Sequence, residues 1–184
     1  MRVDVTTYYL EMRSPSQLKP KTAVIEGLQI IKAELPSAEL QHFLYRSVGG
    51  DWYWYEKAHW TYAQWLEYAL NPDLHTFVAY VKGTPAGYFQ LERQPEGNVE
   101  LAYFGLLGGF IGLGLGSHLL TQAIQTAWEL GASRVWVHTC SLDHASALAN
   151  YQARGFTIYK TETASTEVPD QTPGVWDGAR SPKT

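Results

Sequence analysis

Cysteines and long apolar runs are scarce in this sequence of 184 residues. Cys140 is the single cysteine, so no disulfide can form within the chain, and a reducing compartment is the simplest setting for it. No apolar run approaches the roughly 20 residues that a membrane helix needs, and the first residues lack the apolar core of a signal peptide. We therefore expect a cytoplasmic protein that has no membrane partner.

Clusters of positive charge and of metal ligands are missing as well. Lysine and arginine number 14 against 18 aspartates and glutamates, which gives a formal net charge of −4. Proteins that bind nucleic acids hold the phosphates with clustered cations, so we expect no nucleic-acid partner. His138, Cys140 and His144 have neither a second cysteine nor a His-x-x-x-His pair beside them. A zinc site needs three or four ligands at such spacings, and we expect no metal.

The length of the chain fits one ordinary domain that buries one good core. We expect a single domain over residues 1–184, with its core over about residues 75–163. Residues 165–184 carry Pro169, Pro173 and Pro182 in a polar stretch, which predicts a covering loop and a tail.

Aromatic residues are abundant and make up 14% of the chain, with 7 tryptophans and 12 tyrosines. Many fall between Asp51 and Leu70, which we call the aromatic segment; a helix is predicted within it after Thr61. Rings at this density either pack helices onto a sheet or line a binding pocket, and the sequence leaves both interpretations open. The rings of this segment are those of Trp52, Tyr53, Trp54, Tyr55, His59, Trp60, Tyr62, Trp65 and Tyr68.

Six glycines lie from Gly105 to Gly116, directly after a run that predicts a strand (99–104) and before a predicted helix (117–130). Glycine lets the backbone approach a ligand closely, and the start of a helix offers free N–H groups and the positive end of its dipole. The pattern therefore predicts a loop that binds phosphate. A glycine-rich turn without a ligand is the alternative.

Two common phosphate-binding patterns do not fit this loop. A Walker loop ends in Gly-Lys-Ser/Thr, whereas Gly116 is followed by Ser117 and His118. A dinucleotide-binding loop has glycines at its first, third and sixth positions, and an acidic residue at the end of the next strand. Counted from Gly112, the sixth position is Ser117, and the next predicted strand ends without an acidic residue.

The loop instead resembles that of the GNAT superfamily of N-acetyltransferases, in which a Gln/Arg-x-x-Gly-x-Gly loop opens a long helix and holds the diphosphate of acetyl-coenzyme A through backbone amides. The chain matches this pattern at Gly114 and Gly116. It differs at Ile111, where the superfamily favours Gln or Arg, and at Leu113, where a cation is common. Both differences remove polar contacts to phosphate and leave the amides in place.

A second motif strengthens the resemblance. Tyr151-Gln-Ala-Arg-Gly155-Phe156 is similar to the Tyr-x-x-x-Gly-Phe sequence that ends the superfamily's last helix. Upstream, Ala147 has its usual place, and His144 stands where asparagine is usual. Two motifs in this order, within a strand-helix-strand-helix pattern, are far more specific than either motif alone.

The resemblance implies an α/β fold of the GNAT type: a mixed, largely antiparallel central sheet that is split near its centre, with helices on both faces. Periodicity and turn residues predict strands over 3–12, 27–33, 76–81, 86–91, 98–107, 134–139 and 157–163. Helices are predicted over about 36–48, after Thr61, over 117–130, and over 143–154 with Asp143 as the cap.

The resemblance also implies a function: direct transfer of an acetyl group from acetyl-coenzyme A, as cosubstrate, to an amine. In the superfamily the first two helices and the loop between them wall the acceptor site. The aromatic segment falls at that place, so we expect a small amine that meets aromatic rings; a homodimer is left open. The residues assigned to acetyl-coenzyme A are Phe104, Gly105, Leu106, Ile111, Gly112, Leu113, Gly114, Leu115, Gly116, Ser117, His144 and Asn150.

Two residues are candidates for the chemistry. A protonated amine cannot attack a thioester until a base takes its proton, and a proton donor helps the thiolate to depart. By resemblance, Tyr151 is that donor and Glu100, on the strand before the loop, is the base. Each has a plain alternative: Tyr151 as a tyrosine packed in the core, and Glu100 as an ordinary residue that faces water.

The predicted strand also places its side chains on two faces. Alternation puts Glu100, Ala102 and Phe104 on one face. Leu101 and Tyr103 then lie on the other face. An acidic side chain inside a central strand is expensive to bury without a partner, which favours a solvated or functional site for Glu100.

Two further functions compete with acetyl transfer. The first is a non-catalytic module that keeps the fold and binds coenzyme A without turnover, which Ile111 and Leu113 motivate. The second is a transferase that carries the acetyl group on Cys140. Thioester turnover with an amine separates the first rival from an enzyme, and a trapped acetyl-protein identifies the second.

Overall fold

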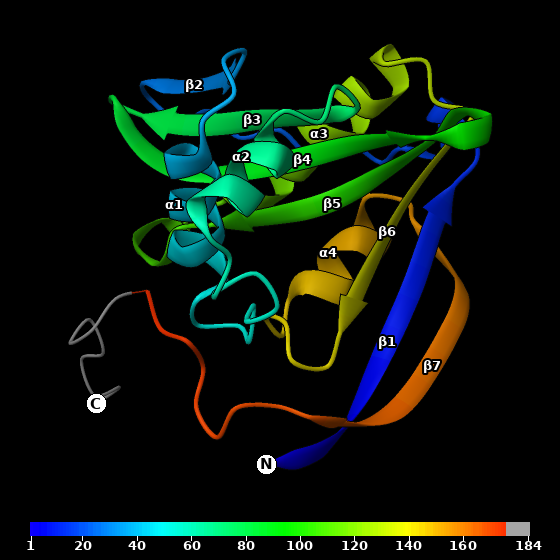
Figure 1. Ribbon diagram of the computed structural model, residues 1–184. Coiled ribbons are helices and arrows are strands. Elements are labelled where there is room, and N and C mark those ends of the chain that lie inside the picture. Colours follow the sequence, from blue (N-terminus) through cyan, green and yellow to red (C-terminus); the bar gives the residue numbers. More distant parts are fainter. Residues whose placement is uncertain (176–184) are drawn as a thin grey trace.

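Seven strands form one sheet in the order β2-β3-β4-β5-β6-β1-β7 in the computed structural model, which describes residues 1–175 (Figure 1). Neighbouring strands are antiparallel except β5 and β6, which run parallel. The predicted mixed, largely antiparallel sheet is thus confirmed. The strands are β1 (Arg2–Met12), β2 (Leu28–Lys32), β3 (Leu74–Val81), β4 (Thr84–Gln94), β5 (Asn98–Leu106), β6 (Arg134–Cys140) and β7 (Thr157–Glu167).

Helices cover both faces of this sheet (Figure 1). Thr61 caps one of them as predicted, because its hydroxyl accepts the N–H of Gln64. The α-helices are α1 (Ala38–Gly49), α2 (Tyr62–Ala69), α3 (Leu115–Glu129) and α4 (Ala147–Ala153). Short 3-10 turns lie at Pro15–Gln17, Pro95–Gly97 and Gly108–Phe110.

The starts of α3 and α4 differ from the prediction. Helix α3 begins two residues earlier than predicted, because Gly114 takes the N-cap position in a left-handed conformation with φ of +80°. The predicted cap at Asp143 is wrong. Its carboxylate accepts the Thr139 hydroxyl at 2.7 Å and the Cys140 N–H at 3.0 Å, so it closes a turn after β6, and α4 starts only at Ala147.

The sheet splits at its one parallel pair. Strand β5 pairs with β6 only over Asn98–Glu100, opposite Arg134–Trp136. Beyond this point the two strands diverge, as Figure 1 shows, and the rest of β6 pairs with β1 alone. Glu100 therefore lies at the apex of the split.

A bulge in β5 overturns the predicted alternation. Leu101 pairs with Leu91 and Tyr103 pairs with Gln90, so Ala102 is an extra residue without a partner in the register. After the bulge the order of faces is reversed. Tyr103 packs with α1 and α2, and so shares the face of Glu100, whereas Phe104 packs with the α3 side of the core.

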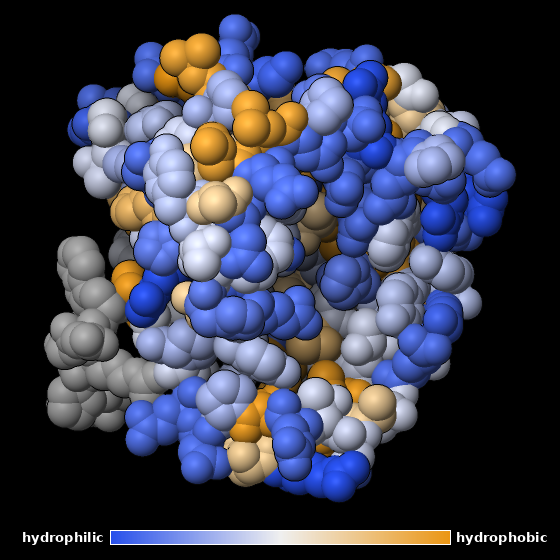
Figure 2. Space-filling view, in the orientation of Figure 1, coloured by the Kyte–Doolittle hydropathy of each residue, from blue (hydrophilic) through white to orange (hydrophobic). Residues whose placement is uncertain are grey.

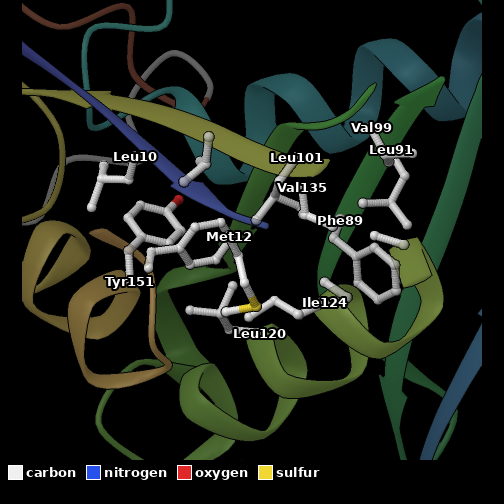
Figure 3. Packing of buried hydrophobic residues seen from close by; sticks show 14 of the residues in the cluster. Leu10, Met12, Phe89, Leu91, Val99, Leu101, Leu120, Ile124, Val135 and Tyr151 are labelled. Carbon is white, nitrogen blue, oxygen red and sulfur yellow. The ribbon is translucent and has the colours of Figure 1, made fainter. Parts of the chain in front are cut away.

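The main core lies between the sheet and α3 (Figure 3). Helix α3 presents a stripe of apolar side chains at helical spacing, with Leu120 and Ile124 fully buried against Phe89 and Leu91. Each such side chain contributes about 1.5–3 kcal/mol by leaving water. On the other face, Leu44 of α1 packs against Tyr88 in a smaller cluster.

A buried polar network fixes α1 and α2 to the sheet. The side-chain amide of Gln90 donates to Gln41 of α1 and to Thr76 of β3, and the Tyr68 hydroxyl of α2 donates to the Gln90 carbonyl at 2.9 Å. Buried polar groups are costly unless they are paired, so the network specifies one arrangement of these four elements. It thereby positions Tyr68 beside β5.

The first and last strands of the chain, β1 and β7, lie side by side beyond β6. Strand β1 lies between β6 and β7. Strand β2 follows β1 in the sequence but lies at the opposite edge of the sheet. Strand β7 extends to Glu167, past the predicted limit of 163. The covering segment then runs to the end of α1, where the Gly174 N–H donates to the Gly50 carbonyl at 2.8 Å. Residues 176–184 of the predicted tail lie outside the described residues.

Candidate active site

A cavity of about 1200 Å³ opens in the split of the sheet. Figure 2 shows this face hollowed near its middle, beside the α1 and α2 region. Of the predicted site residues, Leu113 is 66% exposed and Leu115 is buried under the start of α3, and neither lines the cavity. The structure brings the others together around it: Glu100, Phe104, Gly105, Leu106, Ile111, Gly112, Gly114, Gly116, Ser117, His144, Asn150 and Tyr151.

The glycine-rich loop forms one end of the cavity and leads into α3. Gly112 and Gly114 have φ of +88° and +80°, a conformation that favours glycine. No side chain caps the first turn of α3, so its N–H groups remain available to a ligand. Gly105 serves packing instead, since a Cβ there would lie 2.3 Å from Val48 of α1.

Tyr151 lies between the core and the cavity. Its ring makes edge contacts with Phe104 and Phe156, and Figure 3 shows it at the end of the core cluster. Its hydroxyl has no hydrogen-bond partner among residues 1–175, and the residue lines the cavity. Burial, reinforced by the charge of Asp143, raises the pKa of Tyr151, so the hydroxyl keeps its proton. It can therefore donate a hydrogen bond to a group in the cavity.

Glu100 is buried, and its partners explain how the sheet tolerates it. One carboxylate oxygen lies 3.2 Å from Nδ1 of His138 on β6, and the other accepts the side-chain amide of Gln94 at 2.8 Å. Gln94 in turn accepts the indole N–H of Trp136 at 2.9 Å. The network spans the apex of the split and joins β4, β5 and β6 through side chains.

The same contact makes His138 sensitive to pH. The hydrogen bond with Glu100, together with its negative charge, raises the pKa of His138 although burial lowers it. A histidine whose pKa is raised in the folded state adds to the free energy of unfolding. This contribution is complete below the pKa of the unfolded state, about 6.5, and is lost as the pH rises through the raised pKa of the folded state. Because the His138 side chain is 49% exposed, screening keeps the contribution small.

We predict that His138→Gln lowers the melting temperature more at pH 6 than at pH 9, by about 2–4 °C at most, because only the protonated ring forms the ion pair. Thermal unfolding of both proteins at the two pH values measures the difference. His59→Gln, at an exposed histidine, is the matched control. An equal effect of His138→Gln at both pH values would contradict the ion pair.

The aromatic segment divides between packing and lining. Trp65 is 3% exposed and packs on Tyr45, so for this ring the packing interpretation is confirmed. Trp52 lies edge-on to His144 at 4.8 Å between ring centres, and Trp54 donates to Asp143 at 3.4 Å. The rings of the segment that line the cavity are Trp52, Tyr53, Trp54, Tyr55 and Tyr68.

Lys57 occupies a cage of rings at this end of the cavity. Its ammonium lies 4.7 Å from the ring centre of Trp60 and 5.2 Å from those of Tyr68 and Tyr103, and it donates to the Tyr103 hydroxyl at 3.0 Å. Burial lowers the pKa of Lys57, although nearby carboxylates oppose this. The ring faces therefore accept an ammonium group here.

Glu92 is a second carboxylate in the cavity that the sequence interpretation missed. It lies directly opposite Glu100 in the β4–β5 pairing. Burial and the charge of Glu100 raise its pKa. The short turn at Gln94–Gly97 could have predicted this pair. When the two strands that it joins are paired residue by residue from the turn, Glu92 comes to lie opposite Glu100. No comparable signal pointed to Lys57.

Two other features are absent from residues 1–175. No group of three histidines, cysteines, aspartates or glutamates in this part of the chain is placed to hold a metal ion. No helix in the same part is long and apolar enough to span a membrane.

The sheet order, the split and the loop before α3 together define a fold of the GNAT type. The sequence model of the Acetyltransferase (GNAT) family matches residues 38–156. The chain belongs to this family.

Its relatives include two uncharacterized N-acetyltransferases, from Mycobacterium tuberculosis (strain ATCC 25618 / H37Rv) and Mycobacterium bovis, each 33% identical over 101 residues, or 55% of this chain. The chain covers 64% of the length of these curated relatives.

Solved structures share the fold. A GCN5-related N-acetyltransferase from Kribbella flavida is 22% identical with a TM-score of 0.61, over 87% of this chain and 57% of its own. Another from Sphaerobacter thermophilus is 16% identical with a TM-score of 0.66, over 86% of this chain and 50% of its own.

Proposed function

We propose that the protein transfers an acetyl group from acetyl-coenzyme A directly to a small cationic amine. One observation carries the proposal: a single cavity joins the glycine-rich loop, Tyr151, Glu100 and the rings of the aromatic segment. The cosubstrate and the acceptor thus have adjoining places. The cytoplasm remains the expected setting, which rests on the single cysteine.

The residues divide the chemistry among them. Backbone amides from Gly112 to Ser117 hold the diphosphate of the cosubstrate at the start of α3. Glu100, hydrogen-bonded to His138, takes the proton of the bound ammonium so that the nitrogen lone pair can attack the thioester carbonyl. Tyr151 donates its hydroxyl hydrogen to the sulfur as the carbon–sulfur bond breaks. The attacking nitrogen loses its remaining extra proton, which restores the tyrosine hydroxyl by way of water, and free thiol and an amide are the products.

The acceptor end of the cavity suits a cation. The Lys57 ammonium occupies three ring faces, so a cationic acceptor would meet the other rings that line the cavity, and such contacts are worth about 0.5–2 kcal/mol. Glu92 and Glu100 add carboxylates to the same wall, and the net charge of −4 does not repel an approaching ammonium. Small basic or aromatic amines are therefore favoured over anionic acceptors.

The two rival functions make different predictions in one assay. Purified protein with acetyl-coenzyme A should release thiol only when an amine is added, and a panel of small amines identifies the acceptor class. Tight binding of coenzyme A with no turnover of any amine would favour the non-catalytic module. Activity confined to strongly anionic acceptors would overturn the cationic class.

Cys140 can be tested in the same samples. Burial, reinforced by the charge of Asp143, raises the pKa of the Cys140 thiol, which disfavours the reactive thiolate. Mass spectrometry of protein incubated with acetyl-coenzyme A alone should therefore show no stable acetyl group on Cys140. A trapped acetyl-protein that Cys140→Ser abolishes would favour the acyl-enzyme route.

We predict that Glu100→Gln lowers kcat/KM about 10²-fold at pH 7, because the amide cannot take a proton. The defect should shrink as the pH rises, since more amine then arrives without its proton. Initial rates from pH 6.5 to pH 9.5 with one amine measure this trend. Glu92→Gln, opposite in the sheet, is the control and should cause a smaller defect. A Glu100→Gln defect that stays constant with pH would remove the base role.

A further inference from the structure

The glycine-rich loop offers amides but no cation to its ligand. No lysine or arginine occurs between Gly105 and His118, and Ile111 and Leu113 stand where charged or polar residues would help. Coenzyme A carries a ribose 3′-phosphate in addition to its diphosphate. Any cation that meets this extra phosphate must therefore come from another part of the chain.

Arg154, at the end of α4, is the first such cation. The residue is only 8% exposed, yet Nε and Nη1 of its guanidinium are buried without a hydrogen-bond partner among residues 1–175. Arginine stays protonated, and a buried charge without partners is strongly unfavourable. Arg154 also lines the cavity. An anion bound in the cavity beside Arg154 would balance this charge.

Lys21 is the second cation, and it comes from the segment between β1 and β2. Three backbone contacts fix this segment beside both helices: the Lys19 N–H donates to the Arg154 carbonyl at 2.9 Å, the Lys21 N–H to the Thr121 hydroxyl at 3.0 Å, and the Ala23 N–H to His118 at 3.1 Å. Lys21 also lines the cavity. The segment thus carries a lysine to the start of α3.

The two helices are joined next to these cations. The Ser117 hydroxyl of α3 donates to the Asn150 side chain of α4 at 3.4 Å. Arg154 follows Asn150 by one helical turn, and Thr121, which holds the Lys21 N–H, follows Ser117 by one turn. Arg154 therefore lies one turn along α4 from the loop, and Lys21 lies beside α3 one turn from its start, both on the α3–α4 side of the cavity.

We propose that Arg154 and Lys21 form a phosphate subsite between α3 and α4, which binds the ribose 3′-phosphate of coenzyme A while the loop amides hold the diphosphate. This inference rests on the proposed function, because it assumes that coenzyme A is bound. The subsite supplies the charge that Ile111 and Leu113 do not. Lys57, in its cage of rings, serves the opposite end of the cavity.

The test compares coenzyme A with 3′-dephospho-coenzyme A by isothermal titration calorimetry. The native protein should bind coenzyme A more tightly, by about 10- to 100-fold, the worth of hydrogen bonds to a charged group. Arg154→Gln and Lys21→Met should each remove most of this preference and leave the affinity for the dephospho form nearly unchanged. Lys21→Met tests the subsite even if Arg154→Gln folds poorly, which thermal unfolding reports.

Lys19→Met is the matched control, because Lys19 lies in the same segment, is exposed and does not line the cavity. It should keep the full preference for coenzyme A. Equal affinity of the native protein for both ligands, or equal losses for both ligands in the variants, would overturn the subsite. A native protein that binds neither ligand would instead refute the proposed function itself.

Discussion

Tyr151→Phe is expected to lower kcat by about 10²- to 10⁴-fold, the usual worth of a positioned proton donor. The ring keeps its contacts with Phe104 and Phe156, so the fold should be preserved. The lost hydroxyl has no protein partner in the described part of the chain, and no buried group is left unpaired by its removal. Affinity for acetyl-coenzyme A should therefore change little, while the departure of the thiolate slows.

Three measurements on the same samples separate these effects: kcat with a fixed amine, the dissociation constant for coenzyme A, and the melting temperature. Tyr62→Phe, at a tyrosine that is 61% exposed on α2, controls for loss of a hydroxyl elsewhere. If Tyr151→Phe retains full kcat, the acid role is removed and Tyr151 is a packing residue.

Gly114→Val is expected to abolish measurable binding of coenzyme A. Gly114 has φ of +80°, which an L-residue adopts at a cost of about 1–2 kcal/mol, and a β-branched residue at more. The loop should shift to relieve this strain, and the amides that precede α3 would then no longer converge on the diphosphate. Calorimetry with coenzyme A measures the loss directly.

Gly83→Val separates loss of binding from loss of stability. Gly83 has φ of +82° in the turn between β3 and β4, and nothing lies within 4 Å of a Cβ placed there. The two substitutions impose a similar backbone strain, so both proteins should lose a similar amount of stability. Only Gly114→Val should lose the ligand. Unchanged affinity in Gly114→Val would show that the loop amides do not hold coenzyme A.

Local patterns predicted most of the elements, because their signals lie within a few residues. Thr61 predicted the start of α2, and the spacing of apolar residues predicted α3. Both patterns can be recognised within one or two helical turns. The placement of Tyr151, Gly114 and Glu100 around one cavity also agrees with the sequence motifs. Their chemical roles stay predictions until the variants are measured.

What the sequence did not reveal depends on contacts between distant residues. The bulge at Ala102 arises from the pairing of β4 with β5, and alternation along one strand alone cannot reveal it. Aspartate is a common helix cap, but the Asp143 carboxylate accepts hydrogen bonds from Thr139 and Cys140 at the end of β6 instead. Lys57 and Lys21 reach the cavity from loops, whose paths follow from tertiary packing and have no periodic signal.

The insertion of β1 between β6 and β7 also shapes how this protein is made. Thr7 pairs with Cys140 and Thr6 pairs with Thr163, so β1 leaves the ribosome long before the strands with which it pairs. Contacts so far apart in sequence slow folding, and an unpaired strand edge invites aggregation in the meantime. The nascent chain therefore completes this half of its sheet, and with it one wall of the cavity, only after β7 has been made.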